Sequence, residues 1–403
     1  MSPGTADIVP ASARAFELLL LCARNGLNEQ QAARVKELVT GGLDWDFLIQ
    51  VAARHNLRPL LYLNLKKTCL ADLPAKVAEE LQGVFITVAA KNLFLSHTLE
   101  MILERFVAQG IAALPFKGPT LALSAYGNLA ARGFGDLDIL VDRADLNTAV
   151  AILQANGFIL ELDLDPGQLA AFADHEDHLV FSSQVGVKVE LHWELSGRYL
   201  ARPLRKQDLQ SALTVSWLTE HEVPHLSGYT LLVYLAVHGS KHIWERVEWL
   251  SCLHELAHSL PEQEWPSALA LADSWHCRRM FLLALFLCRE LLATELPATI
   301  GKEIQGDPRL PELSQHVKHM IYTGSPSDSP GALNVQFSLF HLQVRDTLGD
   351  QIRSLLGLFF RPTNADFYAL ILPAKFAFLY YCFRPSRLLY KGVCRIWGRG
   401  DTY

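Results

Sequence analysis

The spacing of apolar residues changes along this chain, and that change constrains the fold more than any other feature of the sequence. Residues 11–109 and 228–296 place their apolar positions at helical spacing, as amphipathic helices do. Between them lie short runs such as 137–141 and 188–194, which are typical of half-buried strands. We therefore predict an α+β protein in which helical regions flank a small mixed sheet.

The middle of the chain should form one compact α/β unit. A hairpin is expected from residues 178–183 and 188–194, joined across Gln184-Val185-Gly186. Before it, strands and helices should alternate, with Gly157 ending the second helix. In chain order, these expected elements are 111–116 (strand), 120–126 (helix), 137–141 (strand), 143–156 (helix) and 158–162 (strand).

Composition divides the chain into five expected regions. Residues 297–335 are rich in Pro, Gly, Ser and Asp, which favours a connection without regular structure. The expected regions are an N-terminal helical region (1–109), the α/β core (110–225), a helical region (226–300), a linker or long loop (301–335) and a helical, apolar and basic segment (336–403).

Charge and cysteine usage limit the partners and the compartment. The formal net charge is −6, with no block of Lys and Arg before the C-terminal segment, so no extended nucleic-acid surface is expected. The seven cysteines form no CxxC pair, as expected for free thiols in a reducing cytoplasm. We therefore expect a cytoplasmic protein.

The C-terminal segment leaves two interpretations open. Its most apolar stretch, Phe367 to Phe383, is interrupted by Pro373 and Lys375 and is too short to cross a bilayer. The segment also carries basic residues such as Arg384 and Arg387. It could form a peripheral contact with the inner face of a membrane, or a helix pair packed on the protein.

Two aspartates in one expected strand form the sharpest local motif. Side chains of a strand alternate between its faces, so Asp136 and Asp138 should point to one side, and Leu137 and Ile139 into the core. Carboxylates this close repel each other unless a cation lies between them. Mg²⁺ or Mn²⁺ would suit such oxygen ligands, although a solvated strand end is the alternative.

The second strand of the expected hairpin carries another acid. Glu190 and His192 should share one face of this strand, and Val189 and Leu191 the other. If this strand lies beside the first, Glu190 supplies a third carboxylate. Otherwise these residues form the wet face of an amphipathic hairpin.

Basic residues near these strands are candidate phosphate contacts. A Lys117-Gly118-Pro119 turn leads into an expected helix, whose first N–H groups could bind phosphate while glycine permits close approach. Arg132, four residues before Asp136, is a second candidate. The turn could equally be an ordinary strand-to-helix connection.

A histidine pair further along the chain also has two interpretations. His238 and His242 lie one helical turn apart, which is a spacing used by zinc sites. However, no catalytic glutamate or Cys/His quartet accompanies them, so helix packing is favoured. Lys241 could instead reach a nucleotide from this helical region.

Together, these motifs are similar to a known family. Phe116-Lys117-Gly118, Arg132-x-x-x-Asp136-x-Asp138 and Glu190-Leu191-His192-Trp193 resemble the uncharacterised nucleotidyltransferase family of the polymerase-beta-like superfamily. The resemblance is clearest over residues 110–200. The wider superfamily has a Gly-Ser turn before its aspartates, and this chain has Lys117-Gly118 in its place.

The resemblance implies a metal-dependent transfer of a nucleoside monophosphate from an NTP, such as ATP, to a hydroxyl of an acceptor, with release of pyrophosphate. The acceptor would be a small molecule or a biosynthetic intermediate. A non-catalytic nucleotide-sensing protein that keeps the fold is the alternative. The implied catalytic residues and metal ligands are Asp136, Asp138 and Glu190, and the candidate nucleotide-binding residues are Lys117, Gly118, Arg132, His192 and Lys241.

Overall fold

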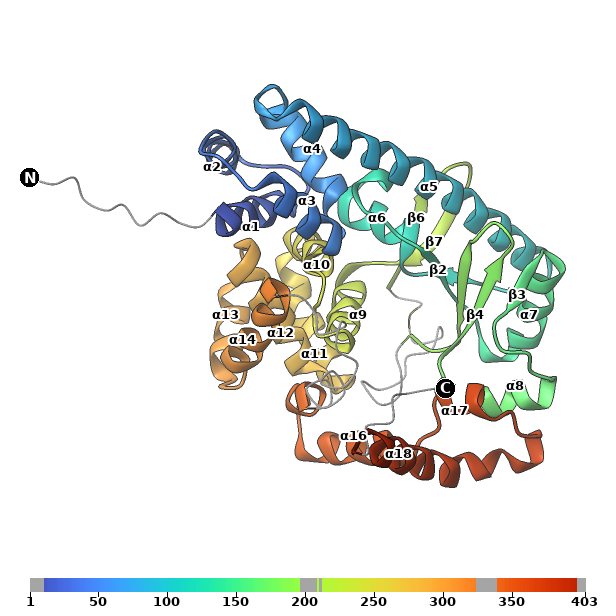
Figure 1. The fold of residues 1–403 in the computed structure, drawn as a ribbon. Helices are drawn as coiled ribbons and strands as arrows, with labels where there is room; N and C mark the ends of the chain where they lie inside the picture. Colours follow the sequence, from blue (N-terminus) through green and yellow to red (C-terminus); the bar gives the residue numbers. More distant parts are fainter. Residues whose placement is uncertain (1–10, 196–208, 210–211, 324–338, 397–403) are drawn as a thin grey trace, which may run out of the picture.

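The computed structural model describes residues 11–195, 209, 212–323 and 339–396, and it confirms the α+β prediction (Figure 1). Helices precede and follow one five-stranded mixed sheet. The N-terminal helices are α1 (Ala11–Cys22), α2 (Glu29–Thr40), α3 (Trp45–Arg54), α4 (Arg58–Thr68), the short 3₁₀ helix η1 (Leu70–Asp72) and α5 (Ala75–Ala108).

The sheet has the order β1-β2-β5-β4-β3. Strands β2 and β5 run parallel at its centre, and the other neighbouring pairs are antiparallel. The expected hairpin is confirmed as β4 and β5. The strands are β1 (Leu114–Pro115), β2 (Asp136–Leu140), β3 (Phe158–Leu160), β4 (His178–Ser183) and β5 (Lys188–His192).

The helices of the core region lie between these strands, as predicted. Gly157 follows α7 with a φ of +82°, as expected for a glycine that ends a helix. A separate two-stranded hairpin of β6 (Leu213–Trp217) and β7 (Glu222–Leu226) was not predicted. The helical elements of the core are α6 (Gly118–Tyr126), η2 (Leu129–Ala131), η3 (Arg143–Asp145), α7 (Leu146–Ala155) and α8 (Pro166–Ala173).

The prediction of a linker at 301–335 was wrong over much of its length. Helices occupy residues 298–306 and 310–323, because Ile300, Ile304 and Val317 are buried in the core despite the neighbouring Pro and Gly. Residues 324–335 lie outside the described residues. The helices after the sheets are α9 (Gly228–Lys241), α10 (Val247–Ser259), η5 (Glu262–Glu264), α11 (Trp265–Ser274), α12 (Arg278–Leu292), α13 (Ala298–Gly306) and α14 (Leu310–Thr323).

The C-terminal segment forms a helical layer along one side of the molecule (Figure 1). In the described residues, no helix combines the length and the apolar character that a membrane span requires. The elements are α16 (Leu348–Phe360), α17 (Asn364–Ala369), the 3₁₀ helix η7 (Ala374–Leu379) and α18 (Tyr380–Ile396).

Two hydrophobic cores hold these elements together. The first joins helices from both ends of the chain, including Leu18 of α1 and Phe281 of α12. The second lies around the sheet and includes Leu137 and Val189. Helix α5 contributes Leu81 to the first core and Phe106 to the second. This long helix (Figure 1) therefore ties the sheet to the helical regions.

Candidate functional site

The two acidic strands are neighbours, as the sequence interpretation required. Asp138 of β2 pairs in register with Glu190 of β5, and Asp136 pairs with Lys188. Ligand atoms of Asp138, Glu190 and His192 all lie within 4.8 Å of one another. The parallel register therefore brings the second aspartate and the glutamate to one face of the sheet.

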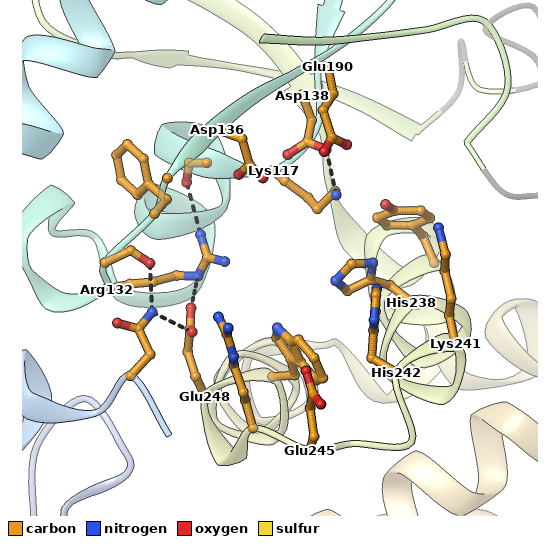
Figure 2. A pocket seen from close by; sticks show the side chains of 18 of the residues that line it. Lys117, Arg132, Asp136, Asp138, Glu190, His238, Lys241, His242, Glu245 and Glu248 are labelled. Atoms are coloured by element: carbon orange, nitrogen blue, oxygen red, sulfur yellow. Dashed lines mark hydrogen bonds and ion pairs between the residues drawn. The ribbon is translucent and has the colours of Figure 1, made fainter. Parts of the chain in front are cut away.

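Lys117 contacts the paired carboxylates directly. Its Nζ lies 2.5 Å from Oδ1 of Asp138, and Figure 2 shows its side chain lying between Asp136 and the Asp138–Glu190 pair. Lys117 is the residue that precedes α6, the helix that begins at Gly118. The predicted turn thus delivers a positive charge to the acidic strands.

Gly118 allows this close arrangement. Its φ is +54°, and a Cβ at this position would lie 3.2 Å from the carbonyl oxygen of Asp136. Glycine is the residue that adopts this backbone conformation without steric cost. The turn and the start of β2 therefore approach each other more closely than a side chain would permit.

His192 contacts both carboxylates. Its Nε2 lies 3.3 Å from Oδ1 of Asp138 and 3.2 Å from Oε2 of Glu190. The ring stacks on His178 of β4, with 4.8 Å between centroids. His178 in turn bonds Asp177 at 2.6 Å through Nδ1. Two stacked imidazoles therefore connect Asp177 to the carboxylates of Asp138 and Glu190.

The pKa values of these groups follow from burial and from their partners. Burial opposes ionisation of Asp138, but the Lys117 ammonium and the hydrogen bond with His192 outweigh it and lower the pKa of this carboxyl. The pKa of Glu190 is also lowered against burial, mainly by His192. By contrast, burial and repulsion from Asp138 raise the pKa of Asp136.

These residues fit a divalent metal ion. Asp138 is 2% exposed, and its Oδ2 has no hydrogen-bond partner among the described residues. A buried carboxylate oxygen without a partner is costly unless a cation or donor meets it. The carboxylates of Asp138 and Glu190 come from adjacent strands, and Asp136 lies beside them (Figure 2). Carboxylate oxygens are the ligands that Mg²⁺ and Mn²⁺ prefer.

A cavity of about 810 Å³ opens in front of the carboxylates. Figure 2 shows Arg132 on one side of it, His238 and Lys241 of α9 on the other, and Glu248 of α10 facing the sheet. A volume of this size accommodates a nucleotide-sized ligand. The sheet and the following helices therefore enclose one site together.

Arg132 has a partner that sequence spacing did not reveal. Its Nε lies 2.5 Å from Oε1 of Glu248, and both side chains are at most 10% exposed. Asn56 bonds the other carboxylate oxygen of Glu248 and the carbonyl of Gly133. Arg132 still lines the cavity, but its charge is already compensated by α10.

His238 of α9 and His242, which directly follows this helix, line the same cavity. His238 and His242 contact each other and the ring of Trp249. Burial lowers the pKa of His242 to about 3 and that of His238 well below its usual value. Within the described part of the chain, the one metal-ligand group of three or more residues is Asp138, Glu190 and His192. Zinc binding by the pair is therefore not supported.

Several residues at the site were missed by sequence reasoning. Glu248 and Asn56 lie in stretches to which the family resemblance extends only loosely, and they were given no role, because they come from helical regions far from the acidic strands in sequence. Asp177 directly precedes β4, and His178 is the first residue of this strand. Their adjacency to His192 could have been found by pairing the two hairpin strands in register.

Comparison with known proteins confirms the family resemblance. Residues 41–293 match the family model described as uncharacterised nucleotidyltransferase. No curated protein and no solved structure matched the chain. The matched range includes Lys117, Asp138 and Glu190, and it extends from α3 to the end of α12. Because this match spans more than half of the sequence, the chain belongs to the uncharacterised nucleotidyltransferase family.

Proposed function

We propose that this protein is a metal-dependent enzyme that transfers a nucleoside monophosphate from an NTP to a hydroxyl of a small acceptor. The observation that carries the proposal is the register of Asp138 with Glu190, with Lys117 at 2.5 Å, at the wall of a nucleotide-sized cavity. A buried group of two acids and one lysine is suited to binding a triphosphate together with a cation.

The acids would hold the cofactor. Asp136, Asp138 and Glu190 would bind one or two Mg²⁺ (or Mn²⁺) ions, which neutralise phosphate charge and activate the acceptor hydroxyl. Glu190 has a lowered pKa, so it is a better ligand for a cation than a proton acceptor. In the transfer, the acceptor oxygen bonds to the α-phosphorus, the bond from that phosphorus to the β-phosphate oxygen breaks, and the hydroxyl proton leaves to solvent.

The remaining residues would position the nucleotide. Lys117 would bind triphosphate oxygens as a point charge, and the turn at Gly118 lets phosphate approach the start of α6. His192 would orient Asp138 and Glu190, which it already bonds. Lys241 would contact the nucleotide from the opposite wall.

Arg132 has a second role in this proposal. Its charge is compensated by Glu248, which weakens the case for Arg132 as the main phosphate contact. Its Nη1 also lies 3.4 Å from the carbonyl of Gly118. Arg132 would therefore hold the turn in place, and any phosphate contact would be additional.

The location proposed for the enzyme is the cytoplasm, where NTPs are available.

The proposal is tested with two radiolabels. The purified protein is incubated with Mg²⁺, a cell extract as the source of acceptor, and NTP labelled at either the α- or the γ-phosphate. Nucleotidyl transfer puts the α-label into an acceptor and the γ-label into pyrophosphate. Transfer of the γ-label to an acceptor would instead indicate a kinase.

Two variants complete this experiment. Asp138→Asn should abolish labelling, whereas Asp163→Asn, at an exposed position outside the cavity, should label like the wild type. Nucleotide binding without labelling by the wild type would contradict the enzyme proposal and favour the nucleotide-sensing alternative.

A further inference from the structure

The C-terminal segment has an inverted distribution of polar and apolar residues. In α16 the one buried residue is an acid, Asp350. Leu348, Ile352, Leu356 and Phe359 recur at helical spacing and are 50–70% exposed. A helix of a water-soluble protein normally buries such a face, so the apolar side of α16 is left without a partner among the described residues.

The same pattern continues through the rest of the segment. Large apolar side chains that are at least 40% exposed recur in every element up to α18, and a patch of this extent marks an interaction surface. They include the aromatic side chains that favour a membrane interface. These residues are Tyr368, Leu370, Ile371, Phe376, Phe378, Leu379, Tyr381, Leu389 and Tyr390.

The charges of this segment favour one kind of partner. Residues 348–396 contain seven Lys and Arg against two Asp, in a chain whose net charge is −6. Both acids are turned inward. Asp350 is paired with Arg353, and Asp366 is fully buried between Arg384 and Arg387. Arg384 and Arg387 are largely buried with Asp366, so the outer surface presents apolar side chains together with the exposed basic residues Arg353 and Lys375.

Exposed positive residues lie on the same elements as these apolar side chains. Lys375 is exposed beside the ring of Phe376, at 5.0 Å from its centroid. The side chain of Arg353 is 72% exposed on α16. Lysine and arginine at such positions can reach lipid headgroups while their stems lie along apolar surface.

We propose that residues 348–391, within the C-terminal segment, bind the surface of an anionic phospholipid membrane. Apolar side chains would enter the headgroup boundary, and the exposed basic residues Arg353 and Lys375 would pair with lipid phosphates. A second copy of the chain is a poorer occupant, because a symmetric contact would place two positive surfaces against each other.

The segment is fixed to the core close to the nucleotide cavity. Arg361 donates to the carbonyl of His175 at 2.6 Å, and the N–H of Asn364 donates to Glu176 at 2.6 Å. The next two residues, Asp177 and His178, line the cavity. A membrane bound at this face would therefore be held next to one wall of the site.

Vesicle sedimentation tests the proposal without any nucleotide, so its outcome is independent of the proposed transferase activity. The full chain is mixed with vesicles of phosphatidylcholine alone, or of phosphatidylcholine and phosphatidylglycerol in equal parts. We expect sedimentation with the anionic vesicles and much weaker sedimentation with the neutral ones. Equal recovery from both, or no sedimentation with the anionic vesicles, would overturn the proposal.

Matched variants locate the contact. Ile352→Ser with Phe359→Ser should reduce partition into anionic vesicles by about tenfold or more, since two large apolar contacts are lost. Ile86→Ser with Phe94→Ser removes two equally exposed apolar residues from α5 and should leave partition unchanged. An equal loss of vesicle partition in both double variants would contradict the assigned surface. A wild-type dimer that dissociates in the Ile352→Ser, Phe359→Ser variant alone would contradict it as well, because a second copy would then cover the surface.

Discussion

The ammonium of Lys117 lies 2.5 Å from Oδ1 of Asp138, the most buried carboxylate of the site. This lysine therefore supplies the positive charge that keeps a buried acid ionised. Attraction to Asp138, against the cost of burial, also raises the pKa of Lys117. In the nucleotide-free protein, this ammonium should compete with a metal cation for Asp138. When NTP binds, the ammonium is expected to contact phosphate, so it should then act together with the cation in binding NTP.

Replacing this lysine should separate the two effects. In Lys117→Met, the nucleotide-free protein should bind Mn²⁺ about tenfold more tightly, because a competing unit charge at this distance is removed, while the apparent Kd for NTP should rise. Calorimetric titration of Mn²⁺, with and without NTP, measures both. Lys188→Met, on the exposed part of β5, is the control. Unchanged Mn²⁺ affinity in Lys117→Met would contradict this account.

The turn before α6 should depend on Gly118 for a specific contact. Gly118→Ala should destabilise the protein by about 1 to 3 kcal/mol and raise the KM for NTP, since its Cβ would crowd the carbonyl of Asp136. Gly127 also has a positive φ, but no atom lies within 4 Å of a Cβ there. Gly127→Ala therefore controls for the backbone cost alone, and it should leave KM unchanged. Equal KM values in the two variants would show that the contact with Asp136 is unimportant.

The ion pair between Arg132 and Glu248 should stabilise the fold far more than a surface pair. Glu248→Gln leaves a buried guanidinium without its counter-charge and should cost about 3 to 5 kcal/mol of unfolding free energy. The matched surface pair is Glu17 with Arg34, whose side chains are about 40% exposed. Glu17→Gln should cost about 0 to 1 kcal/mol. Urea denaturation of both variants measures the difference, and similar losses would refute the assigned role of the buried pair.

Glu176 should make stability depend on pH. Burial, with repulsion from Asp177, raises the pKa of Glu176 from 4.5 to about 7. The folded protein then binds more protons than the unfolded chain between these values, so stability should fall by about 2 to 3 kcal/mol as pH rises through this range. Glu176→Gln keeps an acceptor for the N–H of Asn364 and should remove this part of the pH dependence. Urea unfolding at pH 5 and pH 7 gives the change in unfolding free energy between these pH values for the two proteins. An equal change in both would contradict the prediction.

Local sequence patterns were sufficient to predict the acidic strands. The alternation around Asp136 and Asp138, and that around Glu190, gave the correct faces, because side-chain direction in a strand follows sequence parity. Adjacency of the two strands came from the family resemblance, and the register of Asp138 with Glu190 confirmed it.

Contacts between distant segments could not be predicted in this way. Glu248 reaches Arg132 across more than a hundred residues, and no periodicity encodes that packing. The helices within 298–323 were missed because their flanking Pro and Gly resemble a linker, while burial of residues such as Ile304 decides the structure. The strands β6 and β7 were missed although Leu213, Val215 and Trp217 alternate with polar residues in β6, a pattern that could have predicted this strand.

The central claim is that the carboxylates of β2 and β5 hold a divalent metal beside a nucleotide. Crystals grown with Mn²⁺ and a non-hydrolysable NTP analogue, measured at a wavelength where manganese scatters anomalously, test it most directly. We predict an anomalous peak within ligand distance of Asp138 and Glu190, in contact with phosphate oxygens, and its loss in Asp138→Asn. A nucleotide bound in the cavity with no manganese at these carboxylates would contradict the account.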